Sequence, residues 1–138
     1  MCGGPNATLI NKVYLLQKKI VRIILNKGYM SYTTPLFCQL GIIRVIDLHE
    51  HFLALYMFKC KLGGGLGRVN HYYDTRQHND APVTYQRLTL TQHSAYYLAP
   101  RVWNALPKQI RDAPSLSIFK KHIKLLILGR YQVKLPRR

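Results

Sequence analysis

The five acidic residues are the first place to look for catalysis, and the sequence scatters them: Asp47, Glu50, Asp74, Asp80 and Asp112. Phosphoryl transfer with two metal ions needs neighbouring carboxylates that hold the cations about 4 Å apart. The chain has no Asp-Asp pair, and Asp47 with Glu50 fits a D-x-x-E helix-capping box instead. We therefore expect no polymerase, nuclease or phosphatase chemistry of this type, and no catalytic residue, in this segment.

Two other motifs resemble sites without meeting their requirements. His49 and His51 flank Glu50, but side chains at i and i+2 of a helix diverge by about 200°, so they do not share a metal ion. A glycine run occupies positions 63–67, but a phosphate-binding loop requires a following lysine and hydroxyl residue, which are missing here. We interpret the glycine run as part of a linker and expect no metal and no cofactor in this segment.

The cysteines indicate the redox environment of the chain, and the lengths of its apolar runs bear on membrane insertion. Cys2, Cys38 and Cys60 are an odd number with no C-x-x-C pair, which favours a reducing intracellular location over a disulfide framework or a zinc knuckle. The fullest apolar run, from Phe52 to Phe58, is far shorter than the roughly 20 residues that span a bilayer. We expect no stable membrane insertion.

Basic residues carry the chemistry that the sequence does favour. The chain has 21 Lys and Arg against 5 Asp and Glu, a formal net charge of +16. Like charges on a compact surface repel, so such an excess is typical of proteins that meet a polyanion. We expect contacts to the phosphate backbone of RNA or DNA that do not read bases. The expected contacts are Lys12, Lys18, Lys19, Arg22, Arg76, Arg87, Arg101, Lys120, Lys121 and Lys124.

Tyrosines lie next to several of these cations and add a second possible mode of contact. Tyr72, Tyr73, Tyr96 and Tyr97 could stack on unpaired bases, although half or more of them are expected to be packing residues. Trp103 is interpreted as a structural anchor in the core.

Helices at both ends of the chain are predicted to position most of the cations. The first runs from Thr8 to about Asn26, is ended by Gly28, and carries Lys12, Lys18, Lys19 and Arg22 opposite its apolar face. That face, expected in the core, consists of Leu9, Val13, Leu16, Ile20, Ile23 and Ile24. The last helix runs from Ser115 or Ser117 to about Leu128, is ended by Gly129, and carries Lys120, Lys121 and Lys124 opposite a buried stripe.

The middle of the chain predicts a mixture of elements. Thr34-Pro35 begins a short helix that Gly41 ends, and residues 48–61 form a helix that is apolar almost all round and belongs at the centre of the core. Beta-branched residues predict a strand over 83–92 and a shorter one over 95–98, before a single turn that holds Trp103.

The predicted fold is mainly α (α+β), a small helical domain with a short β-hairpin-like segment after a Gly-rich linker. The domain covers 8–128, with a helical part over 8–62, a linker over 63–82 and a strand-helix part over 83–128. The remaining residues, 129–138, are expected to form a basic, frayed tail.

Several stretches together resemble one known family. They are Leu16–Ile24 (LQKKIVRII), Tyr32–Phe37 (YTTPLF), Tyr73–Arg76 (YDTR), Pro100–Pro107 (PRVWNALP) and Ser115–Lys120 (SLSIFK). In order and spacing they look like the region downstream of the palm and thumb in non-LTR (LINE-type, jockey-like) retrotransposon reverse transcriptases. The likeness covers about Leu9 to Leu128.

This resemblance implies a parent RNA-directed DNA polymerase whose Y-x-D-D palm and endonuclease motifs this chain does not contain. The expected function is then a non-catalytic C-terminal fragment that contributes sequence-indifferent RNA and DNA binding during target-primed reverse transcription. The expected partners are nucleic-acid phosphates and the missing polymerase palm and thumb. The expected location is the nucleus, with cytoplasmic ribonucleoprotein.

Two alternatives remain open from the residues alone. A stand-alone basic RNA-binding protein of the organellar-ribosome type has similar charge, although a transit peptide is richer in Arg and Ser than the first helix. A membrane-surface protein with two basic amphipathic helices is the other alternative, but the apolar helix over 48–61 needs a protein core.

Overall fold

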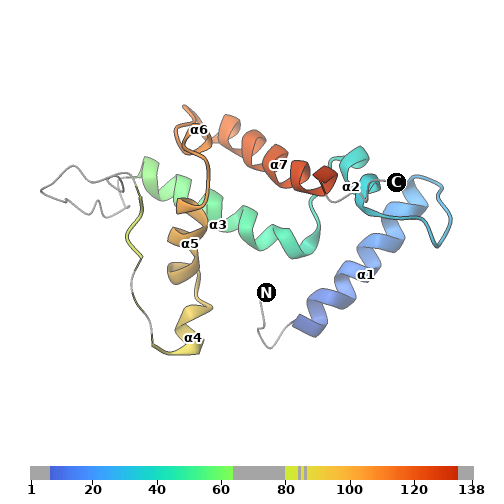
Figure 1. The fold of residues 1–138 in the computed structure, drawn as a ribbon, viewed down its shortest axis with the longest axis horizontal. Coiled ribbons are helices and arrows are strands. Elements are labelled where there is room, and N and C mark those ends of the chain that lie inside the picture. The colour runs from blue at the N-terminus through green and yellow to red at the C-terminus, as the bar shows by residue number, and fades with distance from the viewer. Residues whose placement is uncertain (1–6, 64–79, 84, 86, 134–138) are drawn as a thin grey trace, which may run out of the picture. The chain divides into compact units, whose positions relative to one another are not determined.

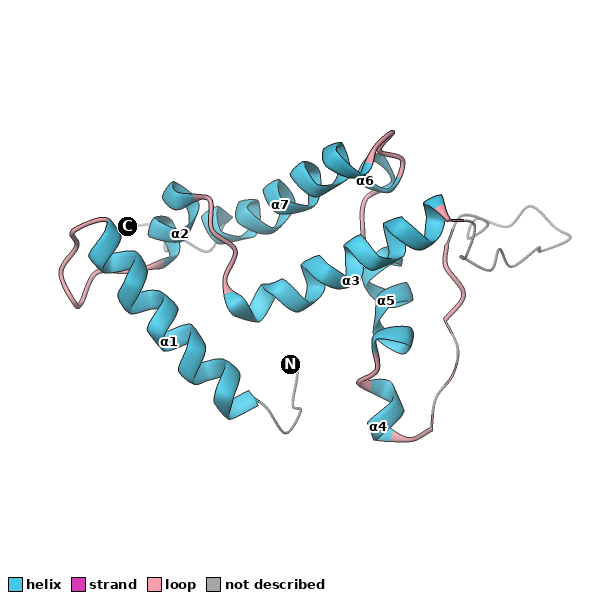
Figure 2. Ribbon diagram, turned by 180° about the vertical axis from the view of Figure 1, so that it is seen from behind, coloured by secondary structure: helices cyan, strands magenta, loops and turns pink. Residues whose placement is uncertain are grey.

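The computed structural model of the chain describes residues 7–63, 80–83, 85 and 87–133 (Figure 1). Only helices, turns and loops occur in these residues, and none of them forms a strand (Figure 2). The helices are α1 (Ala7–Ile24), α2 (Thr34–Leu40), α3 (Val45–Leu62), α4 (Thr89–Gln92), α5 (Ala95–Asn104), α6 (Lys108–Arg111) and α7 (Leu116–Val133). The predicted mainly α character is confirmed.

The chain divides into two compact units. Unit 1 consists of residues 1–49 and 124–138, and unit 2 consists of residues 50–123. The division falls inside α3 and α7, so each of these helices contributes residues to both units.

Unit 1 is built around the packing of α1 on α2. Val21 of α1 and Phe37 of α2 are almost fully buried, and the ring of Tyr14 stacks on that of Phe37 at a centroid distance of 6.4 Å. Pro35 lies in the first turn of α2, and Gly41 ends the helix with φ +61°, a left-handed conformation that glycine adopts without strain. These two predicted signals are confirmed.

The apolar face of α1 is not where the sequence predicted it. Its predicted core residues are 49–77% exposed: Leu9, Val13, Leu16, Ile20, Ile23 and Ile24. Unit 1 buries the adjacent face instead, because Val21 and Tyr14 pack on α2 while Gln17 bonds to the chain between α2 and α3. The helix also ends at Ile24, before Asn26 with φ 49°, so Gly28 does not end it.

Side chains from two other helices hold the start of α3. Gln17 Oε1 accepts a hydrogen bond from the Val45 amide at 3.0 Å, and the Tyr131 hydroxyl accepts one from the Arg44 amide at 3.2 Å. The first amides of a helix lack partners within it, so these bonds satisfy groups that would otherwise be unpaired. The predicted capping box does not begin the helix, because α3 already starts at Val45 and Asp47 lies inside its first turn.

The last helix is longer than predicted. Gly129 does not end α7, which continues to Val133, and Tyr131 is only 1% exposed. The prediction of a frayed segment was therefore wrong for residues 130–133. The buried Tyr131 side chain is the reason, since its ring lies under the Arg44 guanidinium at 3.8 Å and its hydroxyl bonds to Asp47.

Unit 2 is organised around three aromatic rings. Phe58 of α3 stacks on Phe119 of α7 at 4.3 Å, and Trp103 of α5 lies 6.5 Å from Phe58 and 6.0 Å from Phe119. All three side chains are at most 3% exposed, and α5 lies beside α3 in both ribbon views (Figures 1 and 2). The predicted anchor role of Trp103 and the central position of residues around Phe58 agree with this packing.

The predicted strands do not form where the structure describes them, since residues 83, 85, 87 and 88 lie in a loop and the other described strand positions are helical. Residues 89–92 form α4 and residues 95–104 form α5, which includes both Pro100 and Trp103. Ser94 begins α5 with extended φ and ψ, and its hydroxyl accepts a hydrogen bond from the Tyr97 amide at 3.4 Å. Helical spacing then buries Tyr97 and Trp103 together with Ala99, a gain in apolar burial that overrides local β propensity.

Most of the predicted linker lies outside the described residues. At its end, Asn104 holds Ala81 by two hydrogen bonds, one accepted from the Ala81 amide at 2.8 Å and one donated to its carbonyl at 3.0 Å. Arg111, 8% exposed, donates to Asp80 at 2.7 Å. The chain that enters the second half of unit 2 is therefore fixed by α5 and α6.

Candidate nucleic-acid interface

The predicted cations of α1 fall into two groups. Lys12 and Lys19 are exposed. Lys18 is partly buried with its ammonium 4.3 Å from the centroid of the Tyr14 ring. Arg22 donates a hydrogen bond from Nε to the Ser31 carbonyl at 3.1 Å, so it also holds the loop after α1. Lys12 and Lys19 are thus the cations of α1 that are free to meet phosphates.

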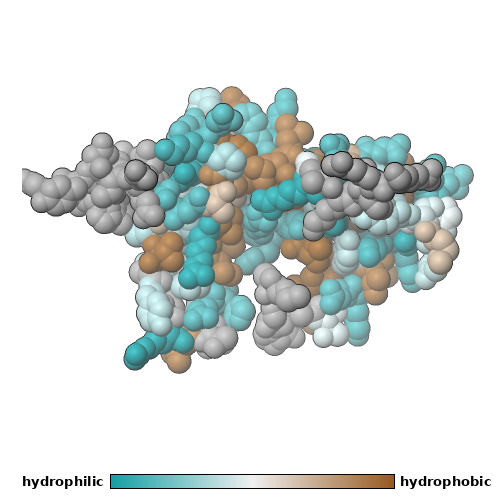
Figure 3. Space-filling model, viewed as in Figure 1, coloured by the Kyte–Doolittle hydropathy of each residue, from teal (hydrophilic) through white to brown (hydrophobic). Residues whose placement is uncertain are grey.

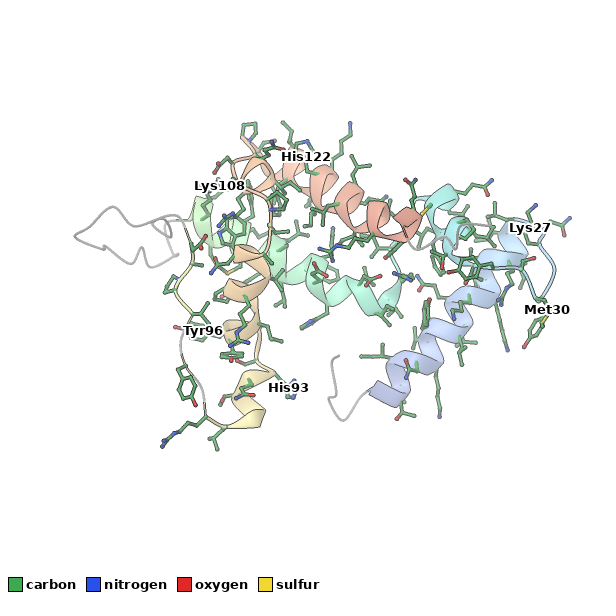
Figure 4. The ribbon with its side chains drawn as sticks, in the orientation of Figure 1. Lys27, Met30, His93, Tyr96, Lys108 and His122 are labelled. Atoms are coloured by element: carbon green, nitrogen blue, oxygen red, sulfur yellow. The ribbon has the colours of Figure 1, made fainter. Side chains whose placement is uncertain are left out.

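That loop adds a further cation that the sequence interpretation did not select. Lys27 and Met30 lie in the loop between α1 and α2 (Figure 4), and both are exposed. Exposure of a lysine beside the α1 cations is a signal that only the structure supplies, because a loop has no periodic pattern from which to predict it.

The predicted cations of α7 are all exposed. Lys120 and Lys121 belong to unit 2, and Lys124 belongs to unit 1. Lys108 on α6 and His122 on α7 are further exposed basic residues of unit 2 (Figure 4). The opposite side of α7 is buried through Phe119, Ile123 and Ile127, as the helical period predicts.

In unit 2, Arg87 and Arg101 are both exposed, and α5 separates the two tyrosines of its first turn. Tyr96 is 70% exposed (Figure 4), whereas Tyr97 is 7% exposed with the Arg101 guanidinium 4.3 Å from its ring centroid. Tyr96 therefore has a free ring face for base stacking, and Tyr97 is a packing residue. Arg76, Tyr72 and Tyr73 lie outside the described residues.

Three acidic side chains of the described residues pair with other basic residues. Asp47 bonds to Arg44 at 3.0 Å, Asp80 to Arg111 at 2.7 Å, and Asp112 to Lys61 at 3.3 Å. None of these three basic partners is a predicted phosphate contact. Within the described part of the chain, the exposed cations Lys12, Lys19, Arg87, Arg101, Lys120, Lys121 and Lys124 make no ion pair.

The charge of unit 1 is especially one-sided. Asp47 is its single acidic residue in the sequence. The carboxylate of Asp47 accepts hydrogen bonds from the Tyr131 hydroxyl at 2.5 Å and from Arg44 Nε at 3.0 Å. Since this one anion is already engaged, no carboxylate side chain of unit 1 remains to neutralise Lys12, Lys19 or Lys124.

Burial shapes the protonation of two groups in unit 1. Desolvation, followed by the hydrogen bond to Asp47, raises the pKa of Tyr131 to about 12. Burial likewise raises the pKa of the Cys38 thiol, whose Sγ donates to the Leu128 carbonyl at 3.6 Å. Both groups stay protonated at neutral pH and serve packing. Sequence reasoning missed Tyr131 because it lay in the segment predicted to fray.

Among the described residues, no three His, Cys, Asp or Glu side chains gather in a way that could hold a metal ion. Over the same residues, no helix combines the length and apolarity needed to cross a bilayer. No family model, curated protein or solved structure matches this chain.

Several residues of the motifs that resemble the family make contacts inside the two units. Gln17 joins α1 to the start of α3, Trp103 fills the core of unit 2, and Asn104 holds Ala81. These motif residues stabilise the two units. The phosphate-facing residues are instead exposed lysines and arginines around them.

Proposed function

We propose that the chain is a non-catalytic C-terminal fragment of a non-LTR retrotransposon RNA-directed DNA polymerase that binds RNA and DNA through phosphates, without base preference. It contributes this binding to target-primed reverse transcription, in the nucleus and in cytoplasmic ribonucleoprotein. The fragment has no polymerase or endonuclease activity of its own and uses no cofactor.

One observation carries the binding proposal: the exposed cations Lys12, Lys19, Lys120 and Lys121 make no ion pair with the described acidic residues. In unit 1, Asp47 is engaged by Arg44 and Tyr131, which leaves Lys12 and Lys19 without a carboxylate. Uncompensated cations raise the electrostatic free energy of a folded unit, and a phosphate backbone relieves that repulsion by replacing condensed counterions. In unit 2, Asp80 pairs with Arg111 and Asp112 with Lys61, and Lys120 and Lys121 make no ion pair among the described residues.

The proposed origin is supported by the order and spacing of the motifs, above all PRVWNALP followed by SLSIFK. The motif residue Trp103 is buried at 3% exposure, and its neighbour Asn104 makes two backbone hydrogen bonds. Such residues are constrained by packing, which is the kind of constraint that keeps a motif recognisable. A Y-x-D-D motif in the reading frame upstream of this chain would support the proposed origin. An upstream reading frame unrelated to a reverse transcriptase would contradict it.

The missing palm and thumb of the polymerase are proposed as the protein partner. The support is the row of exposed aliphatic side chains on α1, which a free soluble helix has little reason to carry.

Salt dependence tests the binding. We expect labelled single-stranded RNA, single-stranded DNA and duplex DNA of equal length to bind the full chain with similar affinity in fluorescence polarisation. The logarithm of the affinity should fall linearly with the logarithm of salt concentration, because counterions are released. Lys12→Gln with Lys19→Gln, and separately Lys120→Gln with Lys121→Gln, should each reduce the steepness of that line by about 1–2.

Lys61→Gln is the matched control, because Lys61 is a cation whose charge is already paired with Asp112. It should leave the salt slope unchanged, with circular dichroism confirming that each variant is folded. Absence of binding to all three ligands in dilute buffer, or a slope that no surface lysine changes, would contradict the proposal.

A further inference from the structure

The exposed apolar residues of α1 have the spacing of a helix-pairing seam. Leu9, Val13, Leu16, Ile20 and Ile23 follow one another at intervals of four, three, four and three residues. This alternation is the 3.5-residue repeat that keeps a stripe of side chains facing a second helix. β-Branched Val13 and Ile20 alternate with Leu9 and Leu16, an arrangement that favours pairing of two helices.

This seam, defined as the five residues above, is free on the surface. Leu16 is 56%, Ile20 55% and Ile23 77% exposed, while α1 packs within unit 1 through Tyr14 and Val21 on another face. Apolar and polar side chains are interspersed over α1 in the space-filling view (Figure 3). Contiguous exposed apolar side chains on a monomeric protein are often functional.

Charges along the seam decide what can cover it. Lys12 and Lys19 line one edge, and Gln17 with Ile24 lines the other, while α1 contains no acidic residue. In an antiparallel pair with a second copy, lysine edges would face each other and repel; in a parallel pair no acid would meet them. A second copy is therefore a poor occupant, and a helix with carboxylates along the facing edge is a good one.

The shape of the stripe favours a helix over a lipid surface. Helices that lie in the membrane interface carry a broad apolar face, with Trp and Phe as anchors beside leucine. The seam of α1 consists of Leu, Val and Ile without an aromatic residue, and the exposed Ile10 and Ile24 widen the apolar surface on one side of it. A row of this kind inserts its side chains between those of a facing helix.

We infer that the seam of α1 docks one amphipathic helix of a protein partner, with aliphatic residues at the same repeat and Glu or Asp opposite Lys12 and Lys19. Lys12 and Lys19 are shared with the proposed phosphate contacts, whereas the five aliphatic residues of the seam are not. The inference rests on the proposed function only for the identity of the partner, which would be a helix of the polymerase half.

A synthetic helical peptide tests the inference on the full chain. The probe carries Leu and Ile at the seam positions of three heptads, with Glu at the flanking positions and a fluorescent label. We expect saturable binding. Leu16→Gln should weaken it by about tenfold or more, because a buried leucine contact is lost. Leu15→Gln is the matched control, since Leu15 is 57% exposed but lies off the seam, and it should leave the affinity unchanged.

Companion probes separate this inference from its rivals. A peptide with the same Glu residues but Gln at the seam positions, and one with Lys in place of Glu, should both bind far more weakly. Equal binding of the Gln-seam peptide, or equal effects of Leu15→Gln and Leu16→Gln, would overturn the inference. Binding to phosphatidylserine-containing vesicles without binding to the peptide would assign the seam to a lipid surface instead. Self-association in sedimentation that Leu16→Gln abolishes would assign it to a second copy.

The result of the peptide-binding test can be distinguished from the result of the nucleic-acid-binding test. If the Leu16→Gln variant no longer binds the peptide but still binds RNA with the same salt dependence, the seam is a protein-docking surface, whatever the origin of the chain. Lys120→Gln with Lys121→Gln lies on α7 and not on the helix that carries the seam, so loss of RNA binding in this variant without loss of peptide binding concerns the proposed function alone.

Discussion

The hydroxyl of Tyr131 donates a hydrogen bond to Asp47 Oδ2 at 2.5 Å and accepts one from the Arg44 amide at 3.2 Å. The single acidic residue of unit 1 is therefore joined to the last turn of α7. This one contact links the start of α3 to the end of the chain that the structure describes.

Replacing Tyr131 with Phe should lower the stability of unit 1 by about 1–3 kcal/mol at neutral pH, because Asp47 loses a buried hydrogen-bond donor. The effect should depend on pH with a defined sign. The pKa of Tyr131 is raised from 10.0 to about 12, so the folded chain holds the phenol proton more tightly than the unfolded chain. This stabilisation is complete below about pH 10 and disappears as the pH rises towards 12.

Urea denaturation of wild type and Tyr131→Phe at several pH values measures the difference. The two midpoints should converge above pH 10. A difference that stays constant across this range would show that the hydroxyl bond does not carry the effect.

Truncating Asn104 should release the segment at Ala81. Asn104→Ala removes both an acceptor for the Ala81 amide and a donor to its carbonyl, a cost of about 1–3 kcal/mol. Amide hydrogen exchange at Ala81 should accelerate. Gln109→Ala, on the exposed surface of α6, is the control and should change neither quantity.

Trp103→Ala should destabilise unit 2 by about 3–5 kcal/mol, because it leaves a cavity beside the stacked rings of Phe58 and Phe119. Tyr96→Ala removes a ring from the same helix that is 70% exposed, and its effect should stay within about 0.5 kcal/mol. Thermal unfolding followed by far-ultraviolet circular dichroism compares the two. Equal effects of both variants would refute the anchor role.

Replacing Gly129 and Gly41 with alanine should change the free energy of unfolding in opposite directions. Gly129 lies within α7 with nothing within 4 Å of a Cβ built on it, so Gly129→Ala should raise the free energy of unfolding by about 0.5–1 kcal/mol. Gly41 has φ +61°, so Gly41→Ala should lower it by about 1–2 kcal/mol. Chemical denaturation of the two variants provides the comparison, and the same sign for both would contradict the helix end at Gly41.

Local signals predicted much of the helical architecture. Pro35 and Gly41 gave α2 its correct limits, and the apolar run around Phe58 marked the buried middle of α3. The 3.6-residue period of α7 correctly separated Phe119 and Ile123 from the exposed lysines. In these cases the chain's local preference and its packing agree.

The errors arose where packing overrode local preference. The apolar period of α1 gave a helix but not the face that is buried, because Gln17 and Tyr14 make specific contacts that hydropathy does not encode. The β-branched run before Ser94 suggested strands, yet Tyr97 and Trp103 gain more by packing from a helix. Gly129 looked like a stop, but the buried Tyr131 carries the helix past it.

For the candidate interface, the sequence could supply the charges but not their pairing. That Asp80 and Asp112 engage Arg111 and Lys61, and so leave Lys120 and Lys121 unopposed, depends on contacts between residues at least 31 positions apart. No periodic pattern contains that information.

The position of Trp103 has a practical consequence. It is the only tryptophan of the chain, and it lies in unit 2 with the Lys61 ammonium 6.0 Å from its ring centroid. Indole emission therefore reports the melting of unit 2, whereas far-ultraviolet circular dichroism reports the helices of both units. One sample with two optical channels can thus reveal whether the two units unfold together or in sequence.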